Sequence, residues 1–528
     1  MTDVDSLRPL LVLLIAFSAT GLVVAGRRWP AVRDGVPVVA AAVSFGLVAS
    51  MLPTVLAGEV PTTDLGTFVP GVDLVFQADP LGLLFGLVVT GLWIPMAIYS
   101  IGYARGTKMA NVTRYNAALC ISLGSGLGVA FAGNLLVLVV FYELTTVGTY
   151  PLVAHSGTER ARRIGLVYVA YVIGGGTAVL FGAVVVFLLA GTVEFVPGGI
   201  PALVEAAATN PAASTVAIGS LLVGFGVKGA VMPLHAWLPD AMVAPTPVSG
   251  VLHAVVVVKS GVFGIARTVL ETFGPEATAA LGVDAALAAV AASTIMLGSL
   301  LALRQDDLKR RLAYSTVAQL SYVVLGISLL VPAAVVGGLV HIAAHAVAKL
   351  TLFCCVGVVA IETKTKTVSE IAGVGRRLPV TMAAFAVGAC SLAGLPLFAG
   401  FASKWYLLVG GAGVHPAVPA VLVVSGVLNV AYFWPIVYGA LFESPDTADP
   451  KPLVEGPLGG RPQAEGEYKS SHSLPMVSLL DDTESRSTLL VPIVGLAIAV
   501  VLLGVVPDRL FLLDLVTQIT ESALEVAG

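Results

Sequence analysis

Apolar residues along this chain come in long runs that are separated by short polar stretches. A helix needs about 20 mostly apolar residues to cross the hydrocarbon core of a bilayer, and about fourteen runs approach or exceed that length. The pattern therefore predicts a polytopic helical bundle. The predicted spans are 9–26, 36–57, 80–104, 114–132, 135–154, 164–190, 214–232, 245–270, 277–303, 312–330, 333–361, 378–406, 416–443 and 488–506.

The composition supports this interpretation. Hydrophobic residues make up 57% of the chain and charged residues 11%, and the mean hydropathy is +0.95. These values lie far outside the range of soluble domains, so we predict an all-α membrane protein. No basic patch of the kind that binds nucleic acid is visible, and we expect no nucleic-acid partner.

Positive charge is distributed unevenly between the two ends of the predicted spans. Most Lys and Arg residues fall in alternate loops, at 27–33, 105–114, 160–163, 304–311, 364–377 and 451–486. Because cytoplasmic loops carry an excess of Lys and Arg, these loops are predicted to be cytoplasmic. The chain is then expected to lie in the cell membrane with both termini outside.

The order of spans and loops suggests five regions. We predict peripheral helices 1–3 in residues 1–113, a first inverted repeat of helices 4–8 in 114–272 and a second of helices 9–13 in 273–443. A segment rich in Pro, Gly, Ser and charge, 444–487, is expected to be a flexible cytoplasmic loop. Residues 488–528 hold helix 14 and the C-terminus.

Four lysines lie inside predicted spans: Lys228, Lys259, Lys349 and Lys404. Charged residues are costly in hydrocarbon and usually line an ion or proton path. Two of the spans should also break, because Pro233 follows Lys228 and Pro396 precedes Lys404, with glycines nearby. Broken spans in corresponding halves indicate an inverted-repeat transporter. The alternatives are ordinary kinks and lysines that extend to an interface.

The histidines of two spans suggest a relay. His341, His345 and Lys349 are spaced i, i+4, i+8 and form one stripe on a helix face. A single such histidine would more often be a satisfied core residue, whereas three titratable groups in line favour a proton relay. His253 and Lys259 lie six residues apart, about 240° around a regular helix, so we expect them to contact different neighbours.

Glu143 lies well inside the fifth predicted span. Burial alone would protonate this carboxylate, whereas a nearby ammonium would keep it ionised, so we predict a cationic partner, with Lys228 as the candidate. Opening and closing such a pair would release and recapture a proton. A static structural ion pair is the alternative.

The remaining chemistry is sparse. Cys120, Cys354, Cys355 and Cys390 show no C-x-x-C spacing, and we expect neither a metal site nor a redox cofactor. No glycine-rich phosphate loop or nucleophile elbow is present, which argues against an enzyme with its own active site.

The motifs resemble those of a known family. The run from Lys228 through the Trp237-Leu-Pro-Asp segment to His253 and Lys259 is similar to the signature of the proton-translocating antiporter-like subunits of respiratory complex I and of Mrp-type Na⁺/H⁺ antiporters. The resemblance continues at 307–316, 345–349 and 400–405 and covers about residues 114–443. It implies fourteen core helices with two inverted five-helix repeats. It also implies Glu143 and Lys228 as the input pair, Lys259 as a connecting relay, His341, His345 and Lys349 as the central axis, and Lys404 as the exit group.

The chain length and Lys404 favour similarity to the D-type subunit of Mrp antiporters, although the polar segment at 444–487 departs from that pattern. The expected function is therefore H⁺ movement, with Na⁺ as the exchanged ion and small hydrophobic membrane subunits as partners. The alternatives are a proton-pumping subunit of a complex I-like dehydrogenase or membrane hydrogenase, which would make the chain part of a translocase, a coupling subunit for inorganic-carbon uptake, and a scaffold subunit that transports nothing.

Overall fold

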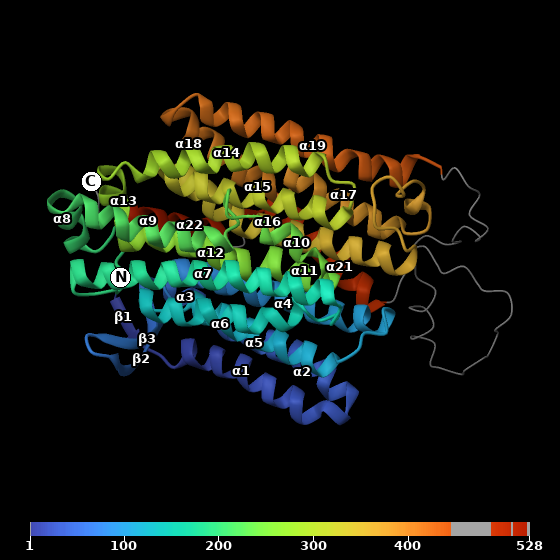
Figure 1. Cartoon of the computed structure of the whole chain (residues 1–528), viewed down its shortest axis with the longest axis horizontal. Coiled ribbons are helices and arrows are strands. Elements are labelled where there is room, and N and C mark those ends of the chain that lie inside the picture. Colours follow the sequence, from blue (N-terminus) through green and yellow to red (C-terminus); the bar gives the residue numbers. More distant parts are fainter. Residues whose placement is uncertain (1, 445–486, 508–510, 525–528) are drawn as a thin grey trace.

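A computed structural model describes residues 2–444, 487–507 and 511–524. The helices of this part run roughly parallel to one long axis, as Figure 1 shows. The loop predicted at 444–487 lies outside the described residues except for its two end positions.

Eleven helices of the described residues are long and apolar enough to cross a bilayer. Some comprise more than one element, and a π-helical stretch inside a helix is labelled η3 or η4. The elements of these helices are α1 (Arg8–Ala25) with η1 (Gly26–Arg28), α2 (Pro30–Ala49) with α3 (Leu52–Leu56), α4 (Pro80–Gly106), α6 (Leu135–Val153), α7 (Glu159–Ala190), α9 (Pro211–Lys228), α11 (Thr246–Gly250) with η3 (Val251–Val255), α12 (Val257–Arg267) and η4 (Thr268–Thr272), α14 (Val283–Leu303), α16 (Pro332–Glu362), α19 (Ala417–Phe442) and α21 (Ser487–Val505).

Three other predicted spans are also helical but are not among these eleven. They correspond to α5 (Val112–Ala130), α15 (Leu308–Ser328) and the pair α17 (Pro379–Ala393) and α18 (Ala399–Val414). The predicted all-α membrane fold is confirmed, whereas the number fourteen stays a prediction. Shorter helical elements lie between the long ones: α8 (Pro201–Thr209), α10 (Trp237–Asp240), η2 (Ala241–Val243), α13 (Gly274–Ala280) and η5 (Val374–Arg376). A further short helix, α22 (Leu512–Leu524), follows α21.

A small sheet, absent from the sequence prediction, lies at the end of the bundle that also holds both chain ends (Figure 1). Strand β1 (Thr2–Asp5) pairs in parallel with β2 (Glu59–Val69), which pairs antiparallel with β3 (Val72–Gln77). The strands are short and partly polar, so they lack the long apolar run that marks the helices. The fold is therefore a helical bundle with one three-stranded sheet added among the described residues.

Local sequence signals explain where several long helices begin. Asp79 caps α4 by accepting a hydrogen bond from the Gly82 amide at 2.6 Å, and Pro80 occupies the first helical position. Asn134 caps α6 in the same way, through the Val137 amide. Such caps satisfy amides that have no partner within the helix.

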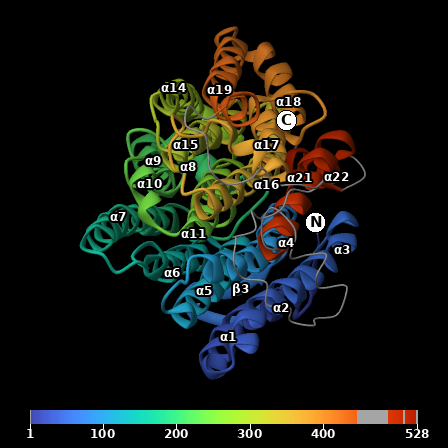
Figure 2. The ribbon, with the colours of Figure 1, turned by 90° about the vertical axis from the view of Figure 1, so that its right-hand side faces the viewer.

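Two spans occupy the centre of the bundle. The apolar windows of Thr246–Thr272 and of α16 are 100% buried inside the protein, and Figure 2 shows α16 surrounded by the other helices, with α1 at one edge and α19 at the other. Outer helices expose apolar side chains instead, such as Leu166, Phe181 and Leu188 of α7. The apolar windows of the two central helices are therefore covered by protein. These helices carry five of the predicted site residues: His253, Lys259, His341, His345 and Lys349.

Candidate functional site

The predicted site residues lie inside the bundle. Lys228, Lys259 and Lys349 are completely buried, and so are His253, His341 and His345. Lys404 and Glu143 are partly buried. Lys228, Lys259 and Lys349 do not reach the surface as interfacial lysines would, so their charges must be balanced by protein groups.

Lys228 is the last residue of α9, and the helix breaks directly after it. The ammonium group donates hydrogen bonds to the Tyr142 carbonyl and, at 2.8 Å, to the Thr145 hydroxyl, and it lies 3.5 Å from the centre of the Tyr142 ring. Lys228 therefore contacts the turn of α6 that contains Glu143.

Glu143 does not form a direct ion pair with Lys228 in the described part of the chain. Its Oε1 atom is buried without a hydrogen-bond partner. Gly176 of α7 faces this oxygen, because a Cβ atom added there would lie 1.5 Å from Oε1. The predicted pair thus lies at one place in the bundle, but the lysine is held by a carbonyl and a hydroxyl, and the carboxylate rests against a glycine.

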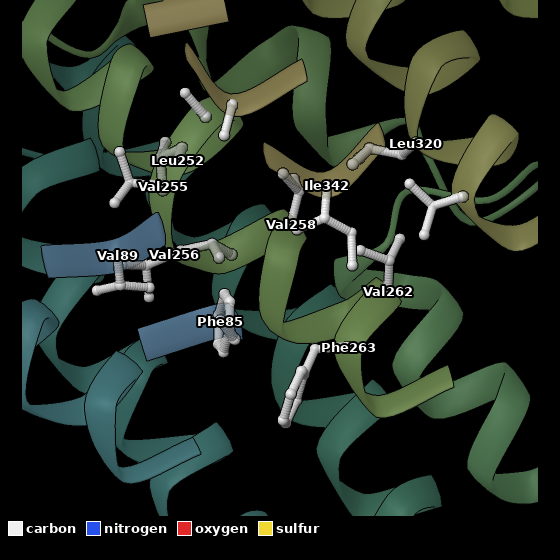
Figure 3. Packing of buried hydrophobic residues seen from close by; sticks show 14 of the residues in the cluster. Phe85, Val89, Leu252, Val255, Val256, Val258, Val262, Phe263, Leu320 and Ile342 are labelled. Carbon is white, nitrogen blue, oxygen red and sulfur yellow. The ribbon is translucent and has the colours of Figure 1, made fainter. Parts of the chain in front are cut away.

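Lys259 contacts the central histidine stripe. Its Nζ atom lies 2.8 Å from Nδ1 of His345, which joins α12 to α16. Figure 3 shows apolar residues packed around this part of α12, with Val258 and Val262 on α12, Leu320 on α15 and Ile342 on α16. In such surroundings a hydrogen bond between two titratable groups is shielded from competing water.

His253 packs against the same central helix that Lys259 contacts. It lies in η3, a π-helical turn, and its ring centre is 5.0 Å from that of Phe353 on α16. Lys259 also contacts α16, but through His345, so the two residues meet different side chains on one helix. A π-helical turn changes the rotation between residues on either side of it, and both residues therefore face α16. Both nitrogens of His253 lack hydrogen-bond partners.

The stripe on α16 also contacts α15. The rings of His341 and His345 lie 6.1 Å apart. Lys349 donates to the Leu312 carbonyl at 2.9 Å and to the Ser315 hydroxyl at 2.6 Å, both on α15. The three titratable groups of α16 therefore lie along one line of polar contacts with Lys259, Gln319 and Ser315, which is called the polar seam below.

A glutamine connects this stripe to Lys404. His341 Nε2 lies 2.9 Å from Gln319 Oε1, and its Nδ1 lies 2.8 Å from the Ser403 hydroxyl of α18. Gln319 donates through Nε2 to the Leu392 carbonyl at 3.3 Å, and Lys404 donates to the same carbonyl. Leu392 is next to the last residue of α17, so the broken helix exposes the acceptor that both groups use.

Several polar residues of the site were missed from the sequence. Ser315 and Gln319 are one helical turn apart on α15, and Tyr322 follows with its ring 4.8 Å from Lys404 Nζ. The i, i+4, i+7 spacing of these three residues is the signal that could have found them.

A second buried charge cluster was also missed. Arg267 of α12 is completely buried and donates to both carboxylate oxygens of Asp79, at 2.6 and 3.0 Å, and to Glu271. Its two carboxylate partners lie at the start of α4 and in η4, so only the folded chain brings them together.

Residues 132–429 match the family described as NADH:quinone oxidoreductase/Mrp antiporter, TM. The chain belongs to this family. The matched region contains the titratable residues from Glu143 to Lys404 described above, and it lies within the 114–443 range over which the motifs resemble the family.

Relatives in the family come from two kinds of complex. The N-type subunit of NADH-quinone oxidoreductase from Desulforudis audaxviator is 34% identical over 83% of this chain and 83% of its own length. The A/B-type subunit of a probable K⁺/H⁺ antiporter from Rhizobium meliloti is 31% identical over 79% of this chain, and the A-type subunit of a Na⁺/H⁺ antiporter from Alkalihalophilus pseudofirmus is 34% identical over 63%. This chain covers only 42% of each of these two antiporter proteins.

Solved structures show the same fold. A chain of the Mrp complex from Dietzia superposes with a TM-score of 0.82 over 98% of this chain and 97% of its own length. A chain of an archaeal membrane-bound sulfane sulfur reductase superposes with a TM-score of 0.81 over 99% of both chains. Each is 22% identical to this chain. The predicted resemblance is confirmed at the level of the family, and the narrower assignment to the D-type subunit stays a prediction.

Proposed function

We propose that this chain is the proton-conducting membrane subunit of a multisubunit Na⁺/H⁺ antiporter. The observation that supports it most strongly is the contact of 2.8 Å between Lys259 and His345, two completely buried titratable side chains on the two central helices. Either partner can donate in this contact, according to which one holds the proton. A proton can therefore pass between α12 and α16 without entering hydrocarbon.

The remaining groups extend this contact in both directions. On one side lie Lys228 and Glu143, the proposed input pair. On the other side the His345 and His341 rings and Gln319 lead toward Lys404, the proposed exit group. His253 packs against Phe353 of α16, and Lys349 lies on α16 itself. Both are proposed as members of the relay. One elementary charge moved across 100 mV is worth about 2.3 kcal/mol, so such a path can couple H⁺ movement to ion exchange.

The orientation in the membrane is part of the proposal. The loops rich in Lys and Arg at 27–33, 105–114 and 160–163 lie at the end of the bundle opposite to β1 and α22 (Figure 1). By the positive-inside rule that end is cytoplasmic, and β1 and α22 then face the outside of a cell membrane. Small hydrophobic membrane subunits are the proposed partners.

Charge removal in the relay tests the function. We expect Lys228→Ala, Glu143→Ala and Lys259→Ala to reduce Na⁺-driven H⁺ movement at least about tenfold in proteoliposomes that contain the assembled complex, because each removes a proton carrier. The matched control is Lys364→Ala, which removes an exposed lysine outside the seam. Undiminished exchange in all three variants would contradict the relay. Loss of assembly without a transport defect in the residual complex would favour a scaffold.

A second function is supported by the relative from Desulforudis, because it matches this chain over 83% of both lengths. In that case the chain pumps protons within a complex I-like assembly whose redox partners supply the energy. Purification of the native complex distinguishes the two functions. Small hydrophobic subunits alone would indicate the antiporter, and hydrophilic iron–sulfur subunits would indicate the dehydrogenase.

A further inference from the structure

A cavity of about 730 Å³ opens at the end of the bundle that carries the basic loops. It lies where α4, α6 and α16 end and where α5, α7 and α15 begin, with residues 242–246 forming one side. None of the relay lysines or relay histidines lines it. The cavity is thus separate from the proposed proton path.

Positive charge dominates its lining. The lining contains five basic side chains and one carboxylate, that of Asp307. Asp307 already caps α15 by accepting a hydrogen bond from the Arg310 amide at 2.8 Å. No described carboxylate forms an ion pair with any of the five. Their charges are therefore available to an anion. The five are Lys108, Arg114, Arg162, Lys309 and Lys366.

Some of these groups are held in place by backbone atoms. Lys309 donates to the carbonyls of Met242 and Ala244 at 2.7 and 2.6 Å, and Arg114 donates to the His155 carbonyl at 3.0 Å. These contacts orient the side chains without neutralising them. An anion that entered would meet cations already fixed at the wall, and little side-chain entropy would be lost on binding.

His155 adds a second observation. The residue is only 8% exposed, its ring belongs to the cavity lining, and Nε2 lies 3.0 Å from the Ala110 carbonyl while Nδ1 has no hydrogen-bond partner. A buried polar atom without a partner is unusual. Because Nε2 donates to a carbonyl, Nδ1 is an acceptor and suits a hydroxyl of a bound ligand, while the five cations suit an anion.

We propose that this cavity binds an anionic phosphate group. Arg and Lys side chains converging on one place suit the several oxygens of a phosphate, and basic pockets between membrane helices bind anionic headgroups. Val356 and Ala360 of α16 supply apolar surface beside the cations, as a phospholipid would need. The phosphate is supplied either by an anionic lipid headgroup or by free phosphate, and the inference does not depend on the proposed transport function.

The test compares two variants of the full chain that each lose two positive charges. Arg162→Gln with Lys366→Gln removes two exposed cations of the lining, and Arg160→Gln with Arg163→Gln removes two exposed cations near the start of α7 that do not line the cavity. Native mass spectrometry of the purified chain in detergent measures binding of phosphatidylglycerol and, separately, of zwitterionic phosphatidylcholine. We expect phosphatidylglycerol to bind roughly 30-fold more weakly to the lining variant and unchanged to the other.

The source of the phosphate is resolved by competition. Displacement of phosphatidylglycerol by inorganic phosphate would support a site that accepts the free ion, and resistance to it would support a site for the lipid headgroup. The proposal would be overturned if both variants bound phosphatidylglycerol as tightly as the unaltered chain, or if both lost the same affinity for it. It would also be overturned if the unaltered chain did not prefer phosphatidylglycerol to phosphatidylcholine. Thermal unfolding checks that the lining variant is folded, and Lys108→Gln is the replacement if it is not.

Discussion

Gly176 leaves room for the carboxylate of Glu143, and this is where a single methyl group should affect transport. In Gly176→Ala the new Cβ would lie 1.5 Å from Oε1 and 2.4 Å from the carboxyl carbon, so the carboxylate must move. We expect H⁺ movement in proteoliposomes to fall at least about tenfold, since a misplaced proton carrier transfers poorly.

The control for this change lies two residues away. A Cβ at Gly174 of the same helix meets nothing within 4 Å, so Gly174→Ala should transport like the unaltered protein. Equal activity of the two variants would mean that the position of Glu143 does not matter for transport.

His155 should make stability depend on pH. Burial lowers the pKa of His155 below its ordinary value of 6.5, and Arg114 nearby adds to the effect. As pH falls below 6.5 the unfolded chain binds the proton before the folded chain does, so this residue costs stability toward lower pH and costs none above 6.5. When the pH is lowered from about 7.5 to about 5.5, the thermal midpoint of His155→Gln should therefore fall less than that of the unaltered protein. Thermal unfolding at both pH values measures this, and parallel losses would contradict it.

Among the elements, α12 approaches the backbone at the end of α9 at Gly261. A Cβ at Gly261 would lie 2.1 Å from the Gly229 amide nitrogen and 2.7 Å from the Lys228 carbonyl carbon. These are backbone atoms and cannot rotate away. We expect Gly261→Ala to cost about 1–3 kcal/mol of stability by overpacking, seen as a lower thermal midpoint in detergent.

Gly219→Ala, in the open part of α9, is the matched change, because its Cβ would meet nothing within 4 Å. It should be neutral or slightly stabilising, since Ala favours helix more than Gly. If Gly261→Ala were as stable as Gly219→Ala, the close approach of α12 to the break beside Lys228 would not be required for folding.

The helix breaks could be predicted from the sequence, whereas the residues at which the broken helices end could not. Proline and glycine near Lys228 and Lys404 indicate a break through the loss of a backbone donor. The structure adds the residues at which the helices end: α9 ends at Lys228 itself, and α17 ends at Ala393, before Lys404 in α18. The π-helical turn at His253 left no comparable signal, because one extra residue in a turn does not change the apolar pattern.

Across the whole molecule, the cluster of Arg267, Asp79 and Glu271 joins the start of α4 to the end of the central span Thr246–Thr272. Removing one member of a buried ion pair leaves an uncompensated charge. We expect Asp79→Asn to lower the stability by about 3–5 kcal/mol, measured as a fall in the thermal midpoint of the purified chain.

A surface ion pair provides the comparison. Asp240 and Arg310 lie 3.8 Å apart with side chains about half exposed, and exposed pairs contribute at most about 1 kcal/mol. Asp240→Asn should therefore change the midpoint little. A similar midpoint for Asp79→Asn would show that the buried cluster does not hold α4 to the centre.

At the scale of the whole molecule, the sequence predicted the helical bundle but not the sheet or the contacts between residues far apart in the chain. Long apolar runs determine helices that cross a bilayer, so nearly all of the spans and the buried lysines were recognisable. The sheet of β1, β2 and β3 depends on pairing between residues 2–5 and 59–77, which no local pattern reveals. Gln319 and Asp79 were missed for the same reason, because their roles come from partners distant in the chain.

Three of the four lysines end on main-chain oxygens: Lys228 on Tyr142, Lys349 on Leu312 and Lys404 on Leu392. Alanine scanning leaves those carbonyls in place, so a mutational survey would find the donors and overlook the acceptors. Replacing the following amide by an ester weakens a carbonyl as acceptor while sparing every side chain. The carbonyl acceptor of each of these hydrogen bonds is thus probed by ester substitution in the backbone, and a side-chain mutation probes only the lysine donor.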